Sequence, residues 1–596
     1  MTVANRAILL QRMRLNSILT LGDPRLVRRT TAPRHRIRNS VLLVIALTLL
    51  FCCRYSNATW TYGAPANPEV RPISQRLFYP WEYFQIAWYT LFHRDTATVA
   101  CDDFTRFHTA GALAPIQHVR VPEHPFMASN SGNNMHCDSY MSDTYEAPGP
   151  TGQNLIIGSR TQGFGGYGTI TYDSLGQLVA VYSNGRSFQL ELLDPYSLEE
   201  LSSHDLPSRP WYWLVQGIMP WEYIGAGMYF YLDDQDRAIV PTTKNTIQVI
   251  QTPDPDGTFE LVREYDLEDY VAPMCWPHKD SIAWVLPDWS GSYYWYATTA
   301  GVVGTVAIDT GEINVLRLEG EIIENSFAVA EEGAYIVSDR ALYRFSQDGT
   351  GQIAIDWRTE YDRGTGKKPG HITRGSGTSV SLVGDQDGLV AITDNAEPRI
   401  NLLFVSRRDG SVVCSQPLFE EGKSGTDISV ACFEHADEMG EKTGIYSALV
   451  ENNWGRHVFP HSRPEPGLTR VDAVRESDGT YSCKEIWASG EKGICVFKLS
   501  LGSGLAYMYW RSETCPITAW YLTAIDFVTG ETVYKKLVGT GLGYNNWAGA
   551  LFLHPSGGIV YSTTIFGLVQ IQDAPHDTKN SEEQQHSSIT KEQPQV

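Results

Sequence analysis

One short polar segment carries the residue types best suited to proton transfer. The stretch NNMHCDSYMSDTYE, residues 133–146, contains His136, Asp138, Asp143 and Glu146. A histidine beside carboxylates can act as an acid–base pair or supply metal ligands, although no metal site is predicted here. The same groups can equally well hydrogen-bond one another within a cap over a larger domain. His136, Asp138 and Asp143 are therefore candidate catalytic residues with a structural alternative.

Paired amides form the second group of candidates. The triplet Asn-Asn-Trp occurs in VENNWGRHVF, residues 450–459, and again in GYNNWAGALF, residues 543–552. Asparagine tolerates the left-handed backbone region and bonds its own backbone, so each triplet predicts a turn that leads into a strand. These amides could bind a ligand or only satisfy the turn backbone. The candidate ligand-binding residues are Asn452, Asn453, Asn545 and Asn546.

Three further ligand-binding candidates and one catalytic candidate precede the first triplet. His371 stands in PGHITRG, Asp394 and Asn395 stand in ITDNAEP, and Glu451 directly precedes the triplet. If all of them lie on the face that carries the triplets, they could contribute to one site.

The surrounding sequence predicts an all-β domain over residues 150–572. Short runs rich in Val, Ile, Tyr and Thr alternate with Gly and Asp-Gly turns, as in GTITYDSLGQLVAVYS and YLTAIDFVTGETVYKKL. Each run predicts a strand, a tight turn and a second strand. Repeating units of four such strands are typical of a β-propeller. We expect eight blades, with seven as the alternative, and expect a strand from the N-terminal side to complete the partial unit at residues 545–572.

A propeller would explain why the triplet occurs twice. The innermost strands of all blades border one central channel, so turns of different blades come together near its axis. The two triplets are 93 residues apart, which corresponds to about two blades. The paired amides are therefore expected at one mouth of the channel, with Trp454 and Trp547 packed between blades.

Charge is distributed unevenly along the 596 residues. Residues 1–40 contain nine arginines and one acid, a formal charge of +8, which leaves −29 on the remainder. An acidic domain is a poor partner for nucleic acid, because phosphate binding needs a basic surface. The expected partners are a small molecule or a protein.

The apolar run VLLVIALTLLFCC, residues 41–53, follows the basic leader. It predicts a signal-anchor or signal segment over residues 41–57, with the arginines left in the cytoplasm and the propeller in the lumen or outside the cell. Cleavage after Ala58 would give a secreted protein instead, and an arginine-rich leader is also typical of mitochondrial import.

Glycosylation and disulfides are expected in that compartment. Asn57 lies in the chain's one Asn-x-Thr/Ser acceptor motif, and eight cysteines follow the apolar run. Cys483 and Cys495 are the expected pair because YSCKEIWASGEKGICVFK predicts two strands around a turn. The alternative is that these cysteines are buried free thiols.

The remaining segments complete the expected organisation. Residues 58–149 form a lead-in and cap with one short helix in FYPWEYFQIAWYTLF, residues 78–92. The polar tail, residues 573–596, is expected to be disordered because it has few large apolar side chains.

Two turns resemble a known repeat. Asp309-Thr310-Gly311-Glu312 and the segment from Asp526 to Glu531 resemble the repeat of the quinoprotein alcohol-dehydrogenase-like propellers. The resemblance implies aromatic residues that dock between blades; Tyr534 stands four residues after Gly530, where a tryptophan is usual. The chain from Pro369 onward is also similar to a group of uncharacterised microbial propellers.

The cofactors of that superfamily are not expected. Quinoprotein dehydrogenases stack pyrroloquinoline quinone (PQQ) on a disulfide between adjacent cysteines, and the one adjacent pair here, Cys52-Cys53, lies inside the apolar run. The sequence also has no Cys-x-x-Cys-His motif for haem.

These observations predict a membrane-anchored propeller that binds a small organic ligand or a protein at the channel mouth. The alternative is a biosynthetic or tailoring enzyme, an isomerase, cyclase or oxidoreductase, that acts on a hydrophobic small molecule. Convergence of His136, Asp138, Glu451 and Asn452 in one pocket would favour the enzyme. Scattered positions would favour a binding scaffold.

Overall fold

The computed structural model describes most of the chain from residue 114 to residue 574. The described residues are 114–130, 132–163, 165–209, 227–254, 257–271, 280–456, 464–511, 519–540, 542–546 and 548–574. The basic leader, the apolar run, Asn57, the helix expected at 78–92, Trp547 and the C-terminal tail lie outside them. In these ranges no helix is both long and apolar enough to cross a membrane.

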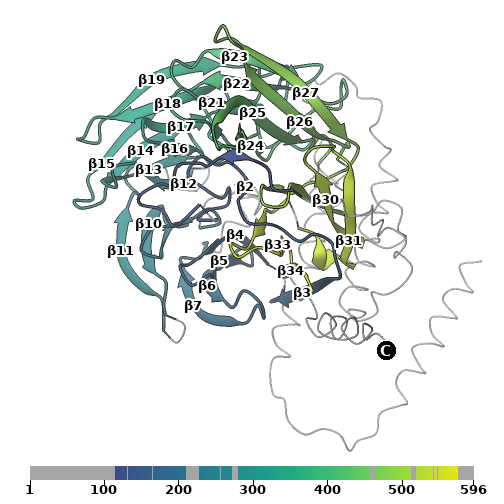
Figure 1. Cartoon of the computed structure of the whole chain (residues 1–596). Helices are drawn as coiled ribbons and strands as arrows, with labels where there is room; N and C mark the ends of the chain where they lie inside the picture. Colours follow the sequence, from purple (N-terminus) through teal and green to yellow (C-terminus); the bar gives the residue numbers. More distant parts are fainter. Residues whose placement is uncertain are drawn as a thin grey trace, which may run out of the picture. The chain divides into compact units, whose positions relative to one another are not determined.

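The strands form eight separate sheets arranged in a ring, which confirms the eight-bladed β-propeller (Figure 1). Each blade is an antiparallel meander whose first strand lies innermost. The first four blades contain the following strands. Blade 1 has β4 (Gly166–Tyr172), β5 (Leu178–Ser183), β6 (Phe188–Leu193) and β7 (Glu200–Leu206); blade 2 has β8 (Tyr231–Leu232), β9 (Arg237–Pro241), β10 (Thr246–Gln251) and β11 (Glu260–Asp266); blade 3 has β12 (Ile282–Pro287), β13 (Tyr293–Thr298), β14 (Val302–Ala307) and β15 (Ile313–Arg317); blade 4 has β16 (Ala328–Ala330), β17 (Gly333–Val337), β18 (Ala341–Gln347) and β19 (Ile353–Glu360).

The last four blades continue the same order. Blade 5 has β20 (Ser381–Val383), β21 (Leu389–Thr393), β22 (Asn401–Ser406) and β23 (Val412–Pro417); blade 6 has β24 (Val430–Ala436), β25 (Lys442–Glu451), β26 (Leu468–Arg475) and β27 (Tyr481–Ser489); blade 7 has β28 (Lys498–Ser500), β29 (Leu505–Arg511), β30 (Ala519–Asp526) and β31 (Thr532–Thr540); blade 8 has β32 (Leu551–Leu553), β33 (Ile559–Thr564) and β34 (Gly567–Asp573), preceded by the 3-10 turn η4 (Leu542–Tyr544).

Burial explains the sequence pattern within each blade. In blade 1 the second strand, LVAVYS, is almost entirely buried, whereas the outermost strand, ELSSHDL, alternates towards solvent. Inner strands are covered on both faces by neighbouring blades, so they need continuous apolar runs. The outermost strand has a solvent-exposed edge and tolerates polar side chains.

The ring is closed by a strand from the N-terminal side, as predicted. Strand β3 (Leu155–Thr161) pairs antiparallel with β34 along its whole length and becomes the outermost strand of blade 8. The sheet order β3-β34-β33-β32 therefore joins the two ends of the domain. The hydrogen bonds between β3 and β34 hold the ring shut.

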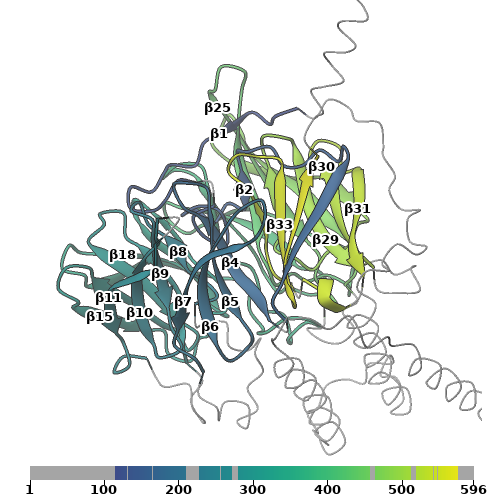
Figure 2. The same ribbon diagram turned by 90° about the horizontal axis from the view of Figure 1, so that it is seen from below.

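The centre of the ring is filled by the chain itself. We call residues 127–130 and 132–145 the channel segment. Strand β2 (Thr144–Tyr145), at its end, lies near the centre of the ring (Figure 1) and pairs with innermost strand β28. Upstream of the segment, β1 (His118–Val119) pairs with β24 where the β24–β25 hairpin extends beyond neighbouring blades (Figure 2). Both pairings make five-stranded sheets.

The channel segment also bonds to blades whose sheets it does not join. The Leu232 N–H donates to the Asn133 carbonyl (2.9 Å), the Val329 N–H to that of Ser139 (2.9 Å) and the Leu382 N–H to that of Tyr140 (2.9 Å). Innermost strands have one edge without a neighbouring strand, and a buried N–H needs an acceptor. The segment supplies those acceptors, and its residues 132–145 are all buried.

Aromatic side chains dock between adjacent blades in a repeated way. The Trp357 indole donates to the Arg407 carbonyl (3.1 Å) in the next blade. The Tyr265 hydroxyl bonds the Ile308 carbonyl (2.7 Å), and the Tyr534 hydroxyl bonds that of Pro150 (2.9 Å). Docking by Tyr534 agrees with the expectation from the resemblance. Membership of the quinoprotein-like superfamily does not follow from this feature alone.

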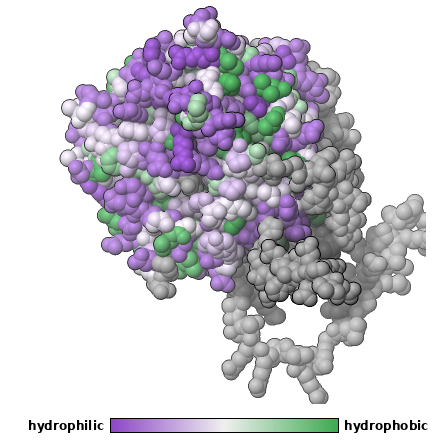
Figure 3. Space-filling view, viewed as in Figure 1, coloured by the Kyte–Doolittle hydropathy of each residue, from purple (hydrophilic) through white to green (hydrophobic). Residues whose placement is uncertain are grey.

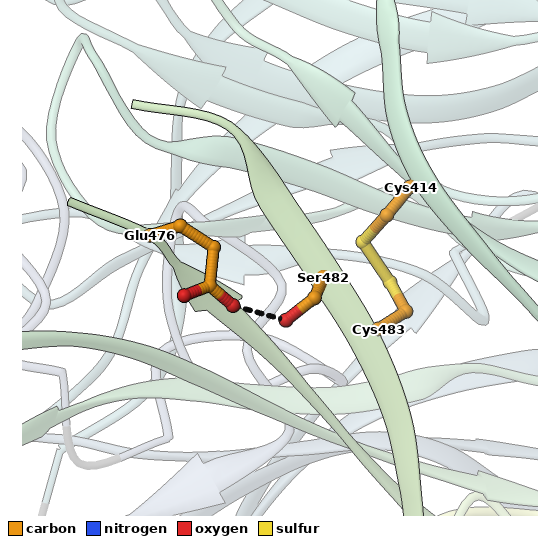
Figure 4. Close-up of a disulfide and its surroundings, with 4 residues drawn as sticks. All are labelled: Cys414, Glu476, Ser482 and Cys483. Carbon is orange, nitrogen blue, oxygen red and sulfur yellow. Dashed lines mark hydrogen bonds between the residues drawn. A yellow bond between two sulfur atoms is a disulfide. The ribbon is translucent and has the colours of Figure 1, made fainter. Parts of the chain in front are cut away.

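The disulfide differs from the predicted one. Cys414 on β23 bonds Cys483 on β27, with Cα atoms 5.7 Å apart and a sequence separation of 69 residues (Figure 4). Cys495 is instead a buried free thiol. The prediction of a Cys483–Cys495 hairpin bond was wrong because Cys483 lies on the outermost strand of blade 6 and faces blade 5. The bond therefore joins two neighbouring blades at the rim.

Candidate functional site

The innermost strands all begin at the same end of the channel, which we call the strand-start mouth. Strands β16, β20 and β24 start there, two to four residues after Glu324, Ser379 and Asp427. This end lies opposite the tip of the β24–β25 hairpin (Figure 2). The connection after β25 and the one before β32 return to the same end, so the turn Asn452–Trp454 and the pair Asn545-Asn546 lie on this face.

Four charged or titratable side chains meet at the strand-start mouth, and we call Glu324, His371, Asp427 and Arg456 the mouth cluster. All four are at least nine-tenths buried. The Arg456 Nη2 atom lies 3.5 Å from Asp427 Oδ2, and Thr373 donates its hydroxyl to Glu324 Oε2 (2.5 Å). The two carboxyl groups are close enough to influence each other's ionisation.

Several polar atoms of the mouth cluster have no hydrogen-bond partner among the protein groups. They are both ring nitrogens of His371 and Arg456 Nε. The carboxyl groups of Asp427 and Glu324 instead hydrogen-bond each other. Buried polar atoms normally have a partner, and each one left without costs about 1–3 kcal/mol. A concentration of such atoms therefore indicates a place where water or a ligand supplies the missing hydrogen bonds.

Burial controls the charge states within the mouth cluster. Burial and then the nearby charge of Glu324 raise the pKa of Asp427 well above its ordinary value, and burial also raises the pKa of Glu324. Burial, followed by the charges of Lys368 and Arg456, lowers the pKa of His371 to about 3. The imidazole is therefore neutral at physiological pH, and the carboxyl pair retains a proton more readily than exposed carboxylates do.

The candidate catalytic residues His136, Asp138 and Asp143 lie in the channel and not in a cap over it. His136 Nδ1 is 3.0 Å from Asp143 Oδ2, and the Lys498 ammonium forms a second ion pair with Asp143. Lys498 also donates to the Met135 carbonyl (2.7 Å). Burial alone would raise the pKa of Asp143, but His136 and Lys498 together lower it. The result is a buried ionic network that ties the channel segment to β28.

Asp138 has a different set of partners. Its carboxylate accepts the N–H groups of Tyr140 (2.9 Å) and Ser142 (3.2 Å) and the Ser142 hydroxyl (2.5 Å). Burial raises its pKa to about 7, against the effect of these hydrogen bonds. Asp138 therefore fixes a turn within the channel segment.

A serine completes a chain of hydrogen bonds with His136 and Asp143. The Ser379 Oγ lies 3.2 Å from His136 Nε2, and the Ser326 hydroxyl donates to Ser379 (2.8 Å). The order serine, histidine, aspartate is that of hydrolytic triads. Here the serine is 2% exposed, and the aspartate also pairs with lysine.

Glu451 is separate from the channel network. It is fully buried, accepts a hydrogen bond from the Asn453 amide (2.8 Å) and lies 3.9 Å from the Cys495 thiol. Burial raises its pKa well above the ordinary value. The contacts of Glu451 therefore do not bring it into one pocket with His136, Asp138 and Asn452, the arrangement that would favour an enzyme.

The first Asn-Asn-Trp turn positions part of the mouth cluster. The Asn453 Oδ1 accepts the Asp427 N–H (3.1 Å) and the Thr426 hydroxyl (3.1 Å), while the Asn452 amide donates to the Lys423 carbonyl (3.0 Å). Both amides thus bind the loop that carries Asp427. Trp454 follows them and is half-buried.

The other predicted ligand-binding residues make local contacts. Asp394 accepts hydrogen bonds from the backbone and amide of Asn401, and Asn395 donates to the Arg363 carbonyl (2.8 Å). Asn546 donates to the Gly549 carbonyl (2.9 Å), and the Asn545 carbonyl accepts from Ile565 (2.9 Å). Whether any of these residues also contacts a ligand remains a prediction.

Of the ligand-binding candidates, His371 is the one that belongs to the mouth cluster. Glu324, Asp427 and Arg456 were not predicted. A weak signal exists, because Glu324-x-Ser326-x-Ala328 and Asp427-x-Ser429-x-Ala431 share a pattern before two innermost strands. Arg456 stands two residues after the first Asn-Asn-Trp triplet.

Other features of the described residues lie away from the mouth cluster. A surface depression of about 340 Å³ at the rim is lined by residues of blades 3 and 4, among them Tyr293, Thr310 and Gln352. The face shown in Figure 3 is mostly hydrophilic, with hydrophobic residues in small separate groups. Within the described ranges, no group of three or more His, Cys, Asp or Glu side chains is arranged to hold a metal ion.

Comparisons with known proteins support no family assignment. No protein-family model matches the chain. An uncharacterised protein of Archaeoglobus fulgidus is 24% identical over 314 residues, which cover 47% of this chain and 58% of that protein. The match thus spans less than two thirds of the relative's length.

Several solved structures are similar to the chain. They include the β-propeller domain of Cps50 (Swd1) from Myceliophteria thermophila, with 10% identity, 59% of this chain and 98% of that chain covered, and a TM-score of 0.34. Saccharomyces cerevisiae Sqt1 has 8% identity, 55% and 77% coverage and a TM-score of 0.36. A chain of the Mitotic Checkpoint Complex has 10% identity, 59% and 90% coverage and a TM-score of 0.33. The assignment of eight blades rests on the strand pairing described above.

Proposed function

We propose that the protein is a binding scaffold whose strand-start mouth holds a small organic ligand. The single observation that carries this proposal is the set of unpartnered buried polar atoms in the mouth cluster. A ligand that forms hydrogen bonds with these atoms offsets the free-energy cost of burying them. A protein partner that inserts a side chain into the same mouth is the alternative occupant.

The channel segment supports binding rather than transport through the ring. Residues 132–145 are buried and bonded to innermost strands, so the channel is filled and rigid at its centre. A ligand at the mouth would meet a preorganised wall, and preorganisation favours affinity because few groups must be ordered on binding.

The cellular setting is part of the proposal. The basic leader and the apolar run favour a single-pass membrane protein with the propeller in the lumen or outside the cell. The Cys414–Cys483 bond agrees with an oxidising compartment. Secretion after cleavage is the alternative. We also propose a distant kinship with the quinoprotein-like propellers, supported by the docking aromatic residues.

Native mass spectrometry tests the proposed function. The full chain, purified in detergent, is compared under folded and denaturing conditions, together with the variant His371→Leu. A species that is bound to the folded wild type and lost both on denaturation and in the variant supports the proposal. Equal folded and denatured masses of the wild type would contradict a tightly held ligand.

An enzyme is the second candidate, favoured by the alignment of Ser379, His136 and Asp143. A nucleophilic serine in this alignment would react with a fluorophosphonate, and Ser379→Ala would abolish the labelling. Absence of labelling in the native protein would leave the alignment as a structural hydrogen-bond chain.

A further inference from the structure

The unpartnered atoms of the mouth cluster include both donors and acceptors. Arg456 Nε can only donate a hydrogen bond. The neutral imidazole of His371 offers one nitrogen of each kind. Their natural complement is a ligand whose groups both donate and accept, and a hydroxyl group does both.

The charges within the mouth cluster nearly cancel. Burial raises the pKa of both carboxyl groups, and the charge of Glu324 raises the pKa of Asp427 further, so the pair retains a proton more readily than exposed carboxylates do. Arg456, 3.5 Å from Asp427, supplies one positive charge. Of the two nearby lysines, Lys368 donates to the Ala396 carbonyl (2.7 Å) and Lys367 is exposed. An anion would meet the carboxyl pair and a cation would meet Arg456, so an uncharged ligand fits best.

An aromatic surface adjoins these polar groups. The rings of Tyr229 and Trp284 lie 4.8 Å apart. Burial raises the pKa of Tyr229 to about 12, with smaller effects from the charges of Arg456, Asp427 and Glu324. Trp284 Nε1 is a further buried donor without a partner. Sugars present C–H faces to aromatic rings and hydroxyl edges to polar groups, and sites with an apolar wall and a few placed polar groups are typical of small-ligand sites.

We propose that the mouth cluster binds an uncharged polyhydroxyl compound of the saccharide class. The inference deepens the proposed function and rests on it. Glu324, Asp427 and His371 would exchange hydrogen bonds with its hydroxyl groups, Arg456 would donate to an oxygen, and Trp284 and Tyr229 would face its ring.

The test uses the full chain and isothermal titration with named sugars. Glucose, galactose, mannose, N-acetylglucosamine and trehalose are compared with glucuronate and glucosamine, which add a negative and a positive charge. We expect saturable binding of at least one neutral sugar and at least about tenfold weaker binding of the charged compounds. No saturable binding of any neutral sugar at ~10 mM, or tighter binding of a charged compound, would overturn the inference.

The variant His371→Leu separates ligand binding from a structural role. His371 bonds no protein group, so the substitution removes no internal hydrogen bond and should not lower the melting temperature of the free protein. We expect its sugar affinity to fall at least about tenfold. His204→Leu on the outermost strand β7 is the matched control and should bind as the wild type does. A destabilised His371→Leu protein with unchanged affinity would show that His371 is structural and would contradict the inference.

The outcomes also distinguish the inference from the proposed function. If the wild type holds a charged species that is lost in His371→Leu, the proposed scaffold function is supported and the saccharide proposal is contradicted. Failure of both experiments would remove both proposals.

Discussion

The Trp487 indole of blade 6 donates a hydrogen bond to the Phe527 carbonyl of blade 7 (2.9 Å) and covers Gly530, where a Cβ would lie 2.6 Å from Trp487 Cδ2. Trp357 of blade 4 makes the same two contacts with blade 5, where it donates to the Arg407 carbonyl and covers Gly410. In each case the glycine follows the bonded carbonyl by three residues. The outer parts of adjacent blades are thus joined by one recurring contact.

We predict that Trp487→Phe lowers the free energy of unfolding by about 0.5–1.5 kcal/mol, because it keeps the ring but removes the N–H donor. Gly530→Ala should cost more than ~1 kcal/mol, since the new Cβ meets the indole and the residue has φ +74°. Gly490→Ala, with no atom within 4 Å, is the control. Chemical denaturation measures all three, and equal stabilities for the two glycine variants would refute the docking contact.

The inter-blade disulfide should stabilise the rim of the propeller. Replacing Cys414 with serine removes a cross-link that closes a loop of 69 residues, and the expected loss is about 2–4 kcal/mol. Peptide mapping without reduction should recover Cys414 joined to Cys483 and should leave Cys495 alkylated. Recovery of a Cys483–Cys495 peptide would contradict the blade 5 to blade 6 bond shown in Figure 4.

The ion pair between Lys498 and Asp143 should hold the channel segment in place. Lys498→Met or Asp143→Asn leaves one buried group without its partner, so each should destabilise the protein by about 3–5 kcal/mol. The double variant should lose less than the sum of the two, because neither charge is then stranded. Additive losses in thermal or chemical unfolding would mean that the two groups do not interact.

Asp138 should make stability depend on pH. Its pKa is raised to about 7 from an ordinary value of 3.8, so the folded state binds the proton more tightly than the unfolded state. This contribution is fully present below pH ~4 and is lost as the pH rises through ~7. Relative to Asp138→Asn, the wild type should therefore lose stability over that interval. The exposed Asp234→Asn should keep the wild-type dependence, and an identical pH profile in Asp138→Asn would contradict the raised pKa.

The architecture could be predicted because its causes are local. Apolar strands separated by Gly and Asp-Gly turns recur along the chain, and a partial last unit requires a closing strand, which β3 provides. The channel segment could not be predicted in the same way. Its sequence mixes polar residues with Met, Cys and Tyr and has no periodic pattern. It is buried because innermost strand edges need hydrogen-bond partners.

The candidate site was predictable only in part, because its residues come from distant parts of the chain and meet only in the folded ring. His371 and the Asn452-Asn453 turn were identified from residue type, and both lie at the strand-start mouth. Glu324 and Asp427 are 103 residues apart and meet because the ring brings the starts of blades 4 and 6 together. Cys414 and Cys483 likewise pair across blades, and the spacing of cysteines does not determine such a pairing.

The most direct measurement is an experimental density map of the purified full chain at the mouth cluster. If the cluster is a ligand site, the map should contain a non-protein molecule larger than water within hydrogen-bond distance of Asp427 and His371. A map in which these side chains bond protein groups or single waters alone, in the presence of saturating sugar, would contradict the account.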